Sequence, residues 1–353
     1  MTSEPKQKAL LIEKKLGEFV VGEIDIWKPP PGQLLLRVQA VSLNPVDWKL
    51  QKRGVDEVPT ILGRDFAGDV VEVGEGVTDF QKGDRVFVQA ADVGAYAAFQ
   101  QYALTLSATT AKIPPGFSYD QVATLPLALS TAYVGLYNNT PHGFGISPPG
   151  PGISADNAGT PILVLGGGSS VARLGNYLSY RNSVIQLAKL SGFSPIITTA
   201  SLKHTDFLKS LGATHVFDRN LGSTELAAEI NKVTTKPIQY VFDAISLPST
   251  QKIGIDILAS GGKLALVLQL AVDVPEDKTV VEILARSRVP SNIHLLEPLY
   301  HDKISGYIAN GYIKPLTFEV LPGGLAGIPG GLARMEADAV SGLKLVGHPQ
   351  ETP

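Results

Sequence analysis

The stretch Pro161-Ile162-Leu163-Val164-Leu165-Gly166-Gly167-Gly168-Ser169-Ser170-Val171-Ala172 decides the fold, because in it an apolar run passes directly into three glycines. Four apolar residues bounded by a turn signal predict a buried strand. The glycines allow a tight turn and a close approach to a ligand, while the amides of a following helix would face an anion such as a pyrophosphate. A helical stretch, Val184–Leu190, and a second apolar run, Pro195–Ala200, follow. The order strand, glycine turn, helix, strand predicts a dinucleotide-binding unit.

The residues after the second strand indicate which dinucleotide would bind. An NAD site usually has an Asp or Glu there to accept from the ribose hydroxyls, whereas a 2′-phosphate requires donors and positive charge. Here the strand runs into Ser201-Leu202-Lys203-His204, and the first carboxylate is Asp206. We therefore predict NADPH, with Ser201 and Lys203 at the 2′-phosphate. The structural alternative is that Ser201 caps the next helix and Lys203 is a solvated charge.

Composition limits the class of protein. The 353 residues are 44% hydrophobic, with a net charge of -3, a sequence pI near 6.1 and a mean hydropathy of +0.12. Such a chain can bury a large core and is long enough for two domains. Without a basic surplus, nucleic acid is not expected as a partner. The start of the chain has no long apolar segment and no later stretch supplies one, so we expect no membrane partner and a cytoplasmic protein.

The first part of the chain is rich in strand signals. Short apolar runs broken by Gly, Pro and Asp predict strands at 9–12, 33–38, 68–74 and 84–88. A helical region at 118–136 follows, and the Pro/Gly/Ser-rich segment 138–160 reads as a surface loop.

The part of the chain after the glycine turn alternates between strands and helices. The predicted strands are 214–218, 239–243, 263–268 and one near Val280, and the predicted helices are 223–233, 248–259 and 295–309. This alternation predicts a parallel sheet with helices on both faces. Two last strands, 315–320 and 343–346, are expected to return to the first domain.

Several strings, in order along the chain, carry a resemblance to a known family. They include Leu43–Lys49, Gly63–Gly68, Lys82–Val86, Gly94–Ala97, Leu125-Pro126 with Thr131-Ala132, the glycine turn, Leu211–Ala213, and Val340–Gly342 with Lys344. Together they resemble the medium-chain dehydrogenase/reductase superfamily and its zinc-free branch of quinone oxidoreductases and enoyl reductases. The resemblance is closest to the fungal trans-acting enoyl reductases that partner polyketide synthases.

The resemblance implies an α/β fold in which a Rossmann doubly wound parallel sheet is joined to a GroES-like β-rich substrate domain. Residues 1–130, completed by 311–353, would form the GroES-like catalytic domain. Residues 131–310 would form the Rossmann NADP-binding domain.

The resemblance also implies site residues. Lys49 and Thr131 would be catalytic, with Asn44 and Lys49 lining the cleft near the nicotinamide and Thr131 contacting its ribose or carboxamide. The implied cofactor-binding residues are Asn44, Pro45, Thr131, Gly166, Gly167, Gly168, Ser169, Ser170, Val171, Ser201, Lys203, Arg219 and Leu268. The alternatives are structural: Asn44 as a turn residue, Lys49 as a solvated charge, and Thr131 as a helix residue that bonds back to its own turn.

The sequence also bears on metal. Zinc alcohol dehydrogenases of this superfamily have a Gly-His-Glu string where this chain has Gly63-Arg64-Asp65, and they need a Cys ligand. The chain contains no cysteine, and its six histidines are scattered without metal-ligand spacing. We predict no zinc site, no disulfide and no thiolate nucleophile.

One segment departs from the family pattern. Between Val171 and Val184 the chain has about nine extra residues, which would add about two and a half turns to a continuous helix and turn its apolar stripe to the other face. We therefore expect the extra segment to loop out. In one arrangement the helix starts at Asn182 or Ser183, away from the glycine turn. In the other, the first helical turn stays at Val171 and the chain bulges near Arg181-Asn182.

Three functions remain open at this point. The first is an NADPH-dependent, zinc-independent reductase of an activated carbon–carbon double bond, in an enoyl thioester or an α,β-unsaturated ketone, with Lys49 or backbone amides as donors to the oxyanion. The second is an NADPH quinone reductase. The third is a cofactor-impaired relative that serves a synthase as a scaffold, which the extra segment favours. The expected partners are a small-molecule or acyl-thioester substrate and, as a candidate, a polyketide synthase.

Overall fold

The computed structural model describes residues 5–166, 178–340 and 342–353. A parallel sheet in the middle of the chain has the strand order β11-β10-β9-β12-β13-β14. Its strands are β9 (Ile162–Leu165), β10 (Ile196–Ala200), β11 (His215–Asp218), β12 (Tyr240–Asp243), β13 (Lys263–Leu266) and β14 (Thr279–Glu282). Every predicted strand of this region is present, so the doubly wound sheet is confirmed.

Helices cover both faces of this sheet, and the central strand β9 shows why. Ile162 and Val164 pack in a core with α3 and α4, while the alternating Leu163 and Leu165 pack in a second core with α6 and α7. A strand buried on both faces must be apolar throughout, as β9 is. The covering helices are α3 (Pro126–Tyr137), α4 (Leu178–Leu190), α5 (Thr205–Leu211), α6 (Ser223–Val233) and α7 (Pro248–Ile257).

Helix α4 corrects the expectation for the extra segment. The helix is continuous from Leu178 to Leu190, so Arg181 and Asn182 lie inside it. A start at Asn182 or Ser183 is therefore wrong, and so is a bulge at Arg181-Asn182. The apolar residues that follow, from Val184 onward, still face the core because the helix keeps one register with the turn that contains Tyr180. The rest of the extra segment lies outside the described residues.

The N-terminal half is a β-rich unit of two sheets. One has the order β2-β1-β4, and the other β15-β16-β3-β5-β6-β8 with β7 paired to β3. The strands are β1 (Lys6–Ile12), β2 (Phe19–Asp25), β3 (Gln33–Ser42), β4 (Thr60–Ile61), β5 (Asp65–Val73), β6 (Arg85–Gln89), β7 (Tyr102–Leu106), β8 (Thr110–Lys112), β15 (Phe318–Val320) and β16 (Lys344–Gly347). Their inward side chains form a separate apolar core.

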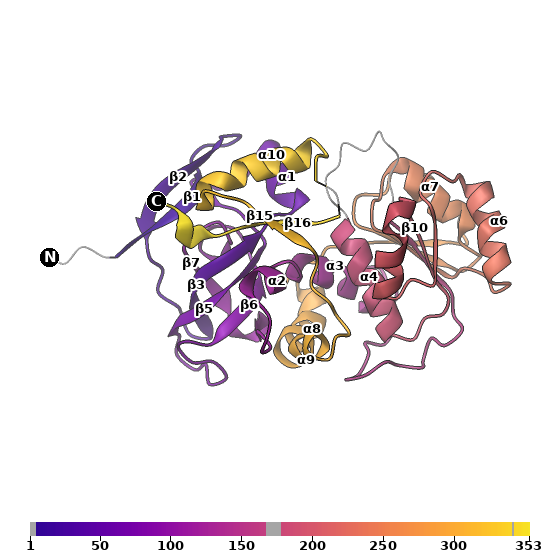
Figure 1. The fold of residues 1–353 in the computed structure, drawn as a ribbon, viewed down its shortest axis with the longest axis horizontal. Helices are drawn as coiled ribbons and strands as arrows, with labels where there is room; N and C mark the ends of the chain where they lie inside the picture. Colours follow the sequence, from indigo (N-terminus) through magenta and orange to yellow (C-terminus); the bar gives the residue numbers. More distant parts are fainter. Residues whose placement is uncertain (1–4, 167–177, 341) are drawn as a thin grey trace.

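The C-terminal tail joins this β-rich unit. Strand β16 pairs antiparallel with β3, with Val346 opposite Ser42, and α10 (Ile328–Glu336) lies against α1 (Pro45–Arg53). Figure 1 shows the tail, in yellow, beside the indigo N-terminal strands, with α3 where the two halves of the molecule meet. The domain boundaries at 130/131 and 310/311 stay a prediction.

Some helices differ from the sequence-based expectation. The helical region 118–136 is two helices, α2 (Tyr119–Ala123) and α3, because Pro126 begins a new helix at its first position. The region 295–309 is α8 (Pro290–Pro298), a π-helical turn and α9 (Ile304–Ala309). Helix α1 was not predicted. Among the helices in the described ranges, none has both the length and the apolar character that crossing a membrane requires.

Candidate active site

A cleft of about 1160 Å³ lies between the two halves of the molecule. Helix α1 and the loop before β5 form one wall, and α3 and the loops after β12 and β13 form the other. The lining residues include Pro45, Lys49, Arg64, Thr131, Ser246 and Leu268. The structure thus brings together four residues predicted from sequence, namely Pro45, Lys49, Thr131 and Leu268.

Lys49 lies on the cleft face of α1. This helix starts with Pro45 at its first position, the Asn44 amide donates to Oδ2 of Asp47 at 2.8 Å, and Gly54 ends it with a φ of 86°. Lys49 is half-buried, and burial lowers the pKa of its ammonium to about 8. A lysine with such a pKa can hold or release a proton near neutral pH.

Thr131 lies in the middle of α3 and is 6% exposed. Its hydroxyl donates to the Leu127 carbonyl at 2.7 Å, which is the back-bonding expected of a helical threonine. Because that donor is used, the Thr131 oxygen can only accept a further hydrogen bond. A bound amide N–H₂ would suit it.

Asn44 belongs to a buried polar network behind the cleft wall. Its Nδ2 donates to Oδ2 of Asp65 at 2.8 Å, and its Oδ1 accepts from Nζ of Lys344 at 2.5 Å. Lys344 also pairs with Asp65 at 3.2 Å, with both side chains almost fully buried. The other Asp65 oxygen accepts from the Leu127 amide at 2.7 Å, in the first turn of α3. The network fixes α1, α3 and β16 relative to one another.

The carboxyl edge of the parallel sheet forms the second part of the site. Strand β9 pairs with β10 on one side and with β12 on the other, so the strand order reverses there, and ligands of open α/β sheets bind at such a point. Gly166 ends β9. The other predicted residues of the glycine turn, Gly167, Gly168, Ser169, Ser170 and Val171, lie outside the described residues.

Gly166 is packed against Arg181 of α4. A Cβ on Gly166 would lie 1.9 Å from Cδ of Arg181, so any larger residue here would displace the arginine side chain. The guanidinium is 2% exposed and donates to the Gly166 carbonyl at 3.2 Å and weakly to Asn182. Burial lowers the pKa of Arg181 to about 10, which leaves it charged at neutral pH. The extra segment thus places a cation at the edge of the sheet.

More positive charge gathers beyond strand β10. Ser201 starts a short 3-10 turn without a capping hydrogen bond from its side chain, and Lys203 in that turn is exposed. The amide of Arg219 donates to the Ala200 carbonyl at 3.0 Å, which holds Arg219 beside the end of β10. Burial, and then the charges of Arg181, Lys203 and Arg219, lower the pKa of His204. The carboxylate of Asp338 lies close enough to interact with the charge of Arg219.

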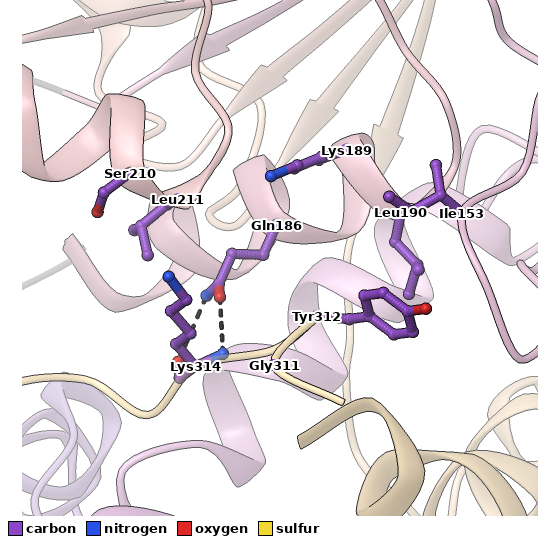
Figure 2. Close-up of a pocket in the computed structure, with 9 residues that line it drawn as sticks. All are labelled: Ile153, Gln186, Lys189, Leu190, Ser210, Leu211, Gly311, Tyr312 and Lys314. Atoms are coloured by element: carbon purple, nitrogen blue, oxygen red, sulfur yellow. Dashed lines mark hydrogen bonds between the residues drawn. The ribbon is translucent and has the colours of Figure 1, made fainter. Parts of the chain in front are cut away.

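A second, smaller pocket of about 170 Å³ lies apart from the cleft (Figure 2). Gln186 of α4 accepts from the Lys314 amide at 2.7 Å, and Leu190 and Tyr312 form an apolar side. The glutamine thereby ties α4 to the segment that leads into β15. This pocket is too small for a dinucleotide, since ligand sites are usually about 300–1,000 Å³.

Comparison with known families covers both halves of the chain. Residues 30–125 match the alcohol dehydrogenase GroES-like domain, and residues 182–288 match the family described as zinc-binding dehydrogenase. A trans-enoyl reductase of Aspergillus japonicus, himH, is 30% identical over 98% of this chain and 98% of its own length. The chain belongs to the medium-chain dehydrogenase/reductase superfamily.

Other relatives agree with this assignment. The enoyl reductase component of the lovastatin nonaketide synthase of Aspergillus terreus, lovC, is 34% identical over 69% of this chain and 64% of its own length. The chain spans 57% to 60% of the length of three fungal dehydrogenases that it matches at 35% to 36% identity. A putative zinc-dependent alcohol dehydrogenase from Rhizobium etli has the same fold, with a TM-score of 0.76, 24% identity and 98% of each chain covered.

Members of this superfamily bind a nicotinamide cofactor, and the residues present fit one. The cleft runs to the carboxyl edge of the sheet, Gly166 lies at that edge, and Arg181, Lys203 and Arg219 place positive charge near it, where phosphates would be favoured. Thr131 offers an acceptor for the carboxamide and Leu268 an apolar contact. The roles of the individual site residues stay predictions.

The described residues of this protein contain no group of side chains suited to bind zinc. Within them, no three His, Asp or Glu side chains gather into a group that could hold a metal ion. Asp65, which follows Arg64, is used instead by Asn44 and Lys344.

Sequence reasoning missed side chains that reach the cleft, or the buried network behind it, from distant parts of the chain. Arg64, Gln89 and Ser246 line the cleft from three separate loops or strand ends, and Lys344 reaches Asp65 from the C-terminal strand. Only Arg64 and Lys344 left a signal, since both fall in strings that match the family.

Proposed function

We propose that this protein is an NADPH-dependent, zinc-independent reductase of an activated carbon–carbon double bond, in an enoyl thioester or an α,β-unsaturated ketone. The observation that carries the proposal is the cleft in which Lys49, with its pKa near 8, and Thr131 face the carboxyl edge of the parallel sheet. The names of two relatives, a trans-enoyl reductase and an enoyl reductase component, support this reaction class.

The cofactor, when bound, supplies a hydride to the β-carbon of the acceptor. Thr131 would orient the nicotinamide by accepting from its carboxamide, because the threonine donor is already used by Leu127. Lys49 holds a proton below about pH 8 and would deliver it to the α-carbon after hydride transfer. The buried network of Asn44, Asp65 and Lys344 holds the start of α1, and therefore Lys49, at a fixed distance from α3.

The preference for NADPH over NADH is supported by the charges beyond β10. Lys203 and Arg219 offer positive charge, and Ser201 a hydroxyl, at the strand end where an NAD site has a carboxylate. A 2′-phosphate carries the negative charge that such a cluster favours.

A polyketide synthase is the candidate partner, because lovC is named as a component of such a synthase. In that setting the acceptor would be an enoyl thioester. The alternative reaction, quinone reduction, would use the same cofactor site.

A substrate screen tests the proposed function. With NADPH, a crotonyl thioester or a simple enone should be reduced with kcat/KM at least tenfold above that of simple quinones, in the presence of chelator as well as without it. Faster reduction of quinones would replace the proposal by quinone reductase. Absence of turnover together with absence of NADPH binding would leave the scaffold role.

A further inference from the structure

Arg64 is an arginine held rigidly in the wall of the cleft. It follows Gly63, whose φ of 106° suits glycine, and a Cβ there would lie 2.6 Å from the ring of Phe99. The Gly63 carbonyl accepts from the Ala98 amide at 3.1 Å, and the Arg64 carbonyl accepts from the Ala90 amide at 2.7 Å. The backbone is thus fixed on both sides, which limits where the side chain can reach.

The guanidinium of Arg64 is buried yet directed to the cleft. The residue is 8% exposed, and it lines the cleft with Lys49 and Thr131. In the ranges that the structure describes, no side chain or carbonyl accepts a hydrogen bond from the guanidinium, and no carboxylate oxygen lies within 4 Å of it. None of its nitrogens is among the buried polar atoms without a partner in the described residues, so they reach the solvent of the cleft, where a bound acceptor would replace water.

The charges around Arg64 keep it cationic. Burial lowers the pKa of the guanidinium, and the nearby carboxylates of Asp47, Asp92 and Asp65 oppose that effect. Arginine retains its proton in proteins in any case. The charge of Arg286 acts in the same direction as burial, and Arg286 also lines the cleft, so two guanidinium groups face the same space.

We propose that Arg64 is a catalytic residue that binds the carbonyl oxygen of the acceptor and stabilises the negative charge that develops on it. The inference rests on the proposed function. A guanidinium can polarise a carbonyl by hydrogen bonds and charge, as a Lewis acid does.

The step balances without any further reagent. The hydride adds to the β-carbon with its two electrons, the π pair of the carbon–carbon double bond forms a new double bond between the α-carbon and the carbonyl carbon, and the carbonyl π pair moves onto the oxygen. Arg64 N–H groups donate to that oxygen while it carries the charge. A proton from Lys49 or water then reaches the α-carbon, the carbonyl is restored, and the cofactor ends oxidised.

The test compares Arg64→Met and Arg64→Lys with the matched control Arg288→Met, an exposed arginine that stacks on Tyr96 outside the cleft lining. With an uncharged enone, Arg64→Met should lose about 10²–10³-fold in kcat with KM changed less than threefold, since the hydrogen bonds strengthen only as charge develops. Arg64→Lys should lie between, and Arg288→Met should match the parent. The NADPH dissociation constant, read by nicotinamide fluorescence, should stay within twofold in all variants.

A second readout does not depend on turnover. In the presence of NADP⁺, 4-nitrophenol serves as an enolate analogue whose ionised form is followed by its visible absorbance. The parent and Arg288→Met should bind the phenolate and lower its apparent pKa, whereas Arg64→Met should not. If Arg64→Met folds poorly, Arg64→Lys takes its place in this measurement. It should lower the apparent pKa of 4-nitrophenol less than the parent does.

Three outcomes would overturn the inference. Unchanged kcat and an unchanged phenol pKa in a folded Arg64→Met protein would make Arg64 structural. A loss confined to coenzyme A thioesters, with the uncharged enone unaffected, would mean that Arg64 binds a distant phosphate instead. Equal weakening of the phenolate effect in Arg288→Met would show a general field effect. If the parent reduces no acceptor, the proposed function fails, while the phenol readout still decides the role of Arg64.

Discussion

At the scale of single residues, the chemistry of this protein depends on how burial changes ordinary side chains. Lys49 is half-buried on α1, and Asp47, two residues before it, is fully buried with its Oδ1 unpaired in the described residues. Burial lowers the pKa of the lysine to about 8 and raises the pKa of Asp47 to about 7. Both groups therefore change charge in the pH range where an enzyme would work.

The pKa of Lys49 predicts a pH profile. Lys49 carries its proton below about pH 8 and loses it above, so kcat of the parent should fall as pH rises through that value. Lys49→Met should lose about 10²-fold in kcat, within the range ascribed to general acids. Lys49→Arg, which stays protonated, should abolish the alkaline fall in kcat even if its kcat is low.

The measurement is kcat against pH from 6 to 10 with an uncharged acceptor. The unchanged NADPH affinity of each variant serves as the control. An alkaline fall that persists in Lys49→Arg would assign the titration to another group and remove Lys49 as the proton donor.

The site residues that could be predicted from the sequence are those that lie in short strings typical of the family. Lys49, Thr131 and Gly166 each sit in a short string that matches the family, and each lies at the cleft or at the sheet edge in the structure. The contacts of Asn44 and the burial of Arg64 could not be predicted, because their partners or neighbours come from segments far along the chain.

At the scale of elements, a buried ion pair joins strands and helices that are distant in sequence. Asp65 at the start of β5 accepts from Asn44 before α1, from Leu127 in α3 and from Lys344 in β16. Three elements therefore share one carboxylate. Breaking the pair from one side leaves the other charge buried.

The pair gives a stability prediction. Lys344→Met should lower the free energy of unfolding by about 3–5 kcal/mol, because the Asp65 carboxyl is left buried without its cation. The double variant Asp65→Asn/Lys344→Met should recover most of the loss, since the amide at 65 can still accept from Leu127. Urea denaturation followed by circular dichroism measures both.

The matched control is Lys252→Met, which removes an exposed i,i+4 pair with Asp256 on α7 and should cost less than about 0.5 kcal/mol. If Lys344→Met cost no more than this control, the buried pair would not hold β16 and α1 together.

Element boundaries show where sequence reasoning reached its limit. Strands β9 to β14 were predicted because buried parallel strands are short apolar runs. Helix α1 was missed because it has few apolar residues and is held by the Asp47 cap and by packing against α10. The start of α4 was misplaced because N-cap residue types at Asn182 and Ser183 occur inside a helix that begins earlier.

At the scale of the whole molecule, positive charge lies in two places, in the cleft between the two halves and at the edge of the parallel sheet. Lys49 and Arg64 lie on the side of the β-rich half, and Lys203, Arg219 and Arg181 lie at the edge of the parallel sheet. The fold class was predicted from the order of strands and helices, since that order determines the sheet topology. The placement of these cations across two halves could not be predicted, because it depends on how the halves pack.

The positive charge of Lys203 and Arg219 at the sheet edge predicts that NADPH and NADH stabilise the protein to different extents. A ligand present at 100 times its dissociation constant stabilises the folded state by about 2.7 kcal/mol. NADPH should therefore raise Tm by several degrees, and NADH at equal concentration should raise it less.

The double variant Lys203→Ala/Arg219→Ala should weaken the binding of NADPH by about 1–3 kcal/mol, the scale of a charge-assisted hydrogen bond, and should leave the binding of NADH unchanged. Thermal denaturation with each cofactor measures this, and Lys209→Ala, an exposed lysine on α5, is the control. Equal shifts by NADPH and NADH in the parent would refute the preference for the 2′-phosphate, because only that phosphate distinguishes the two ligands. No shift with either cofactor would favour the scaffold role.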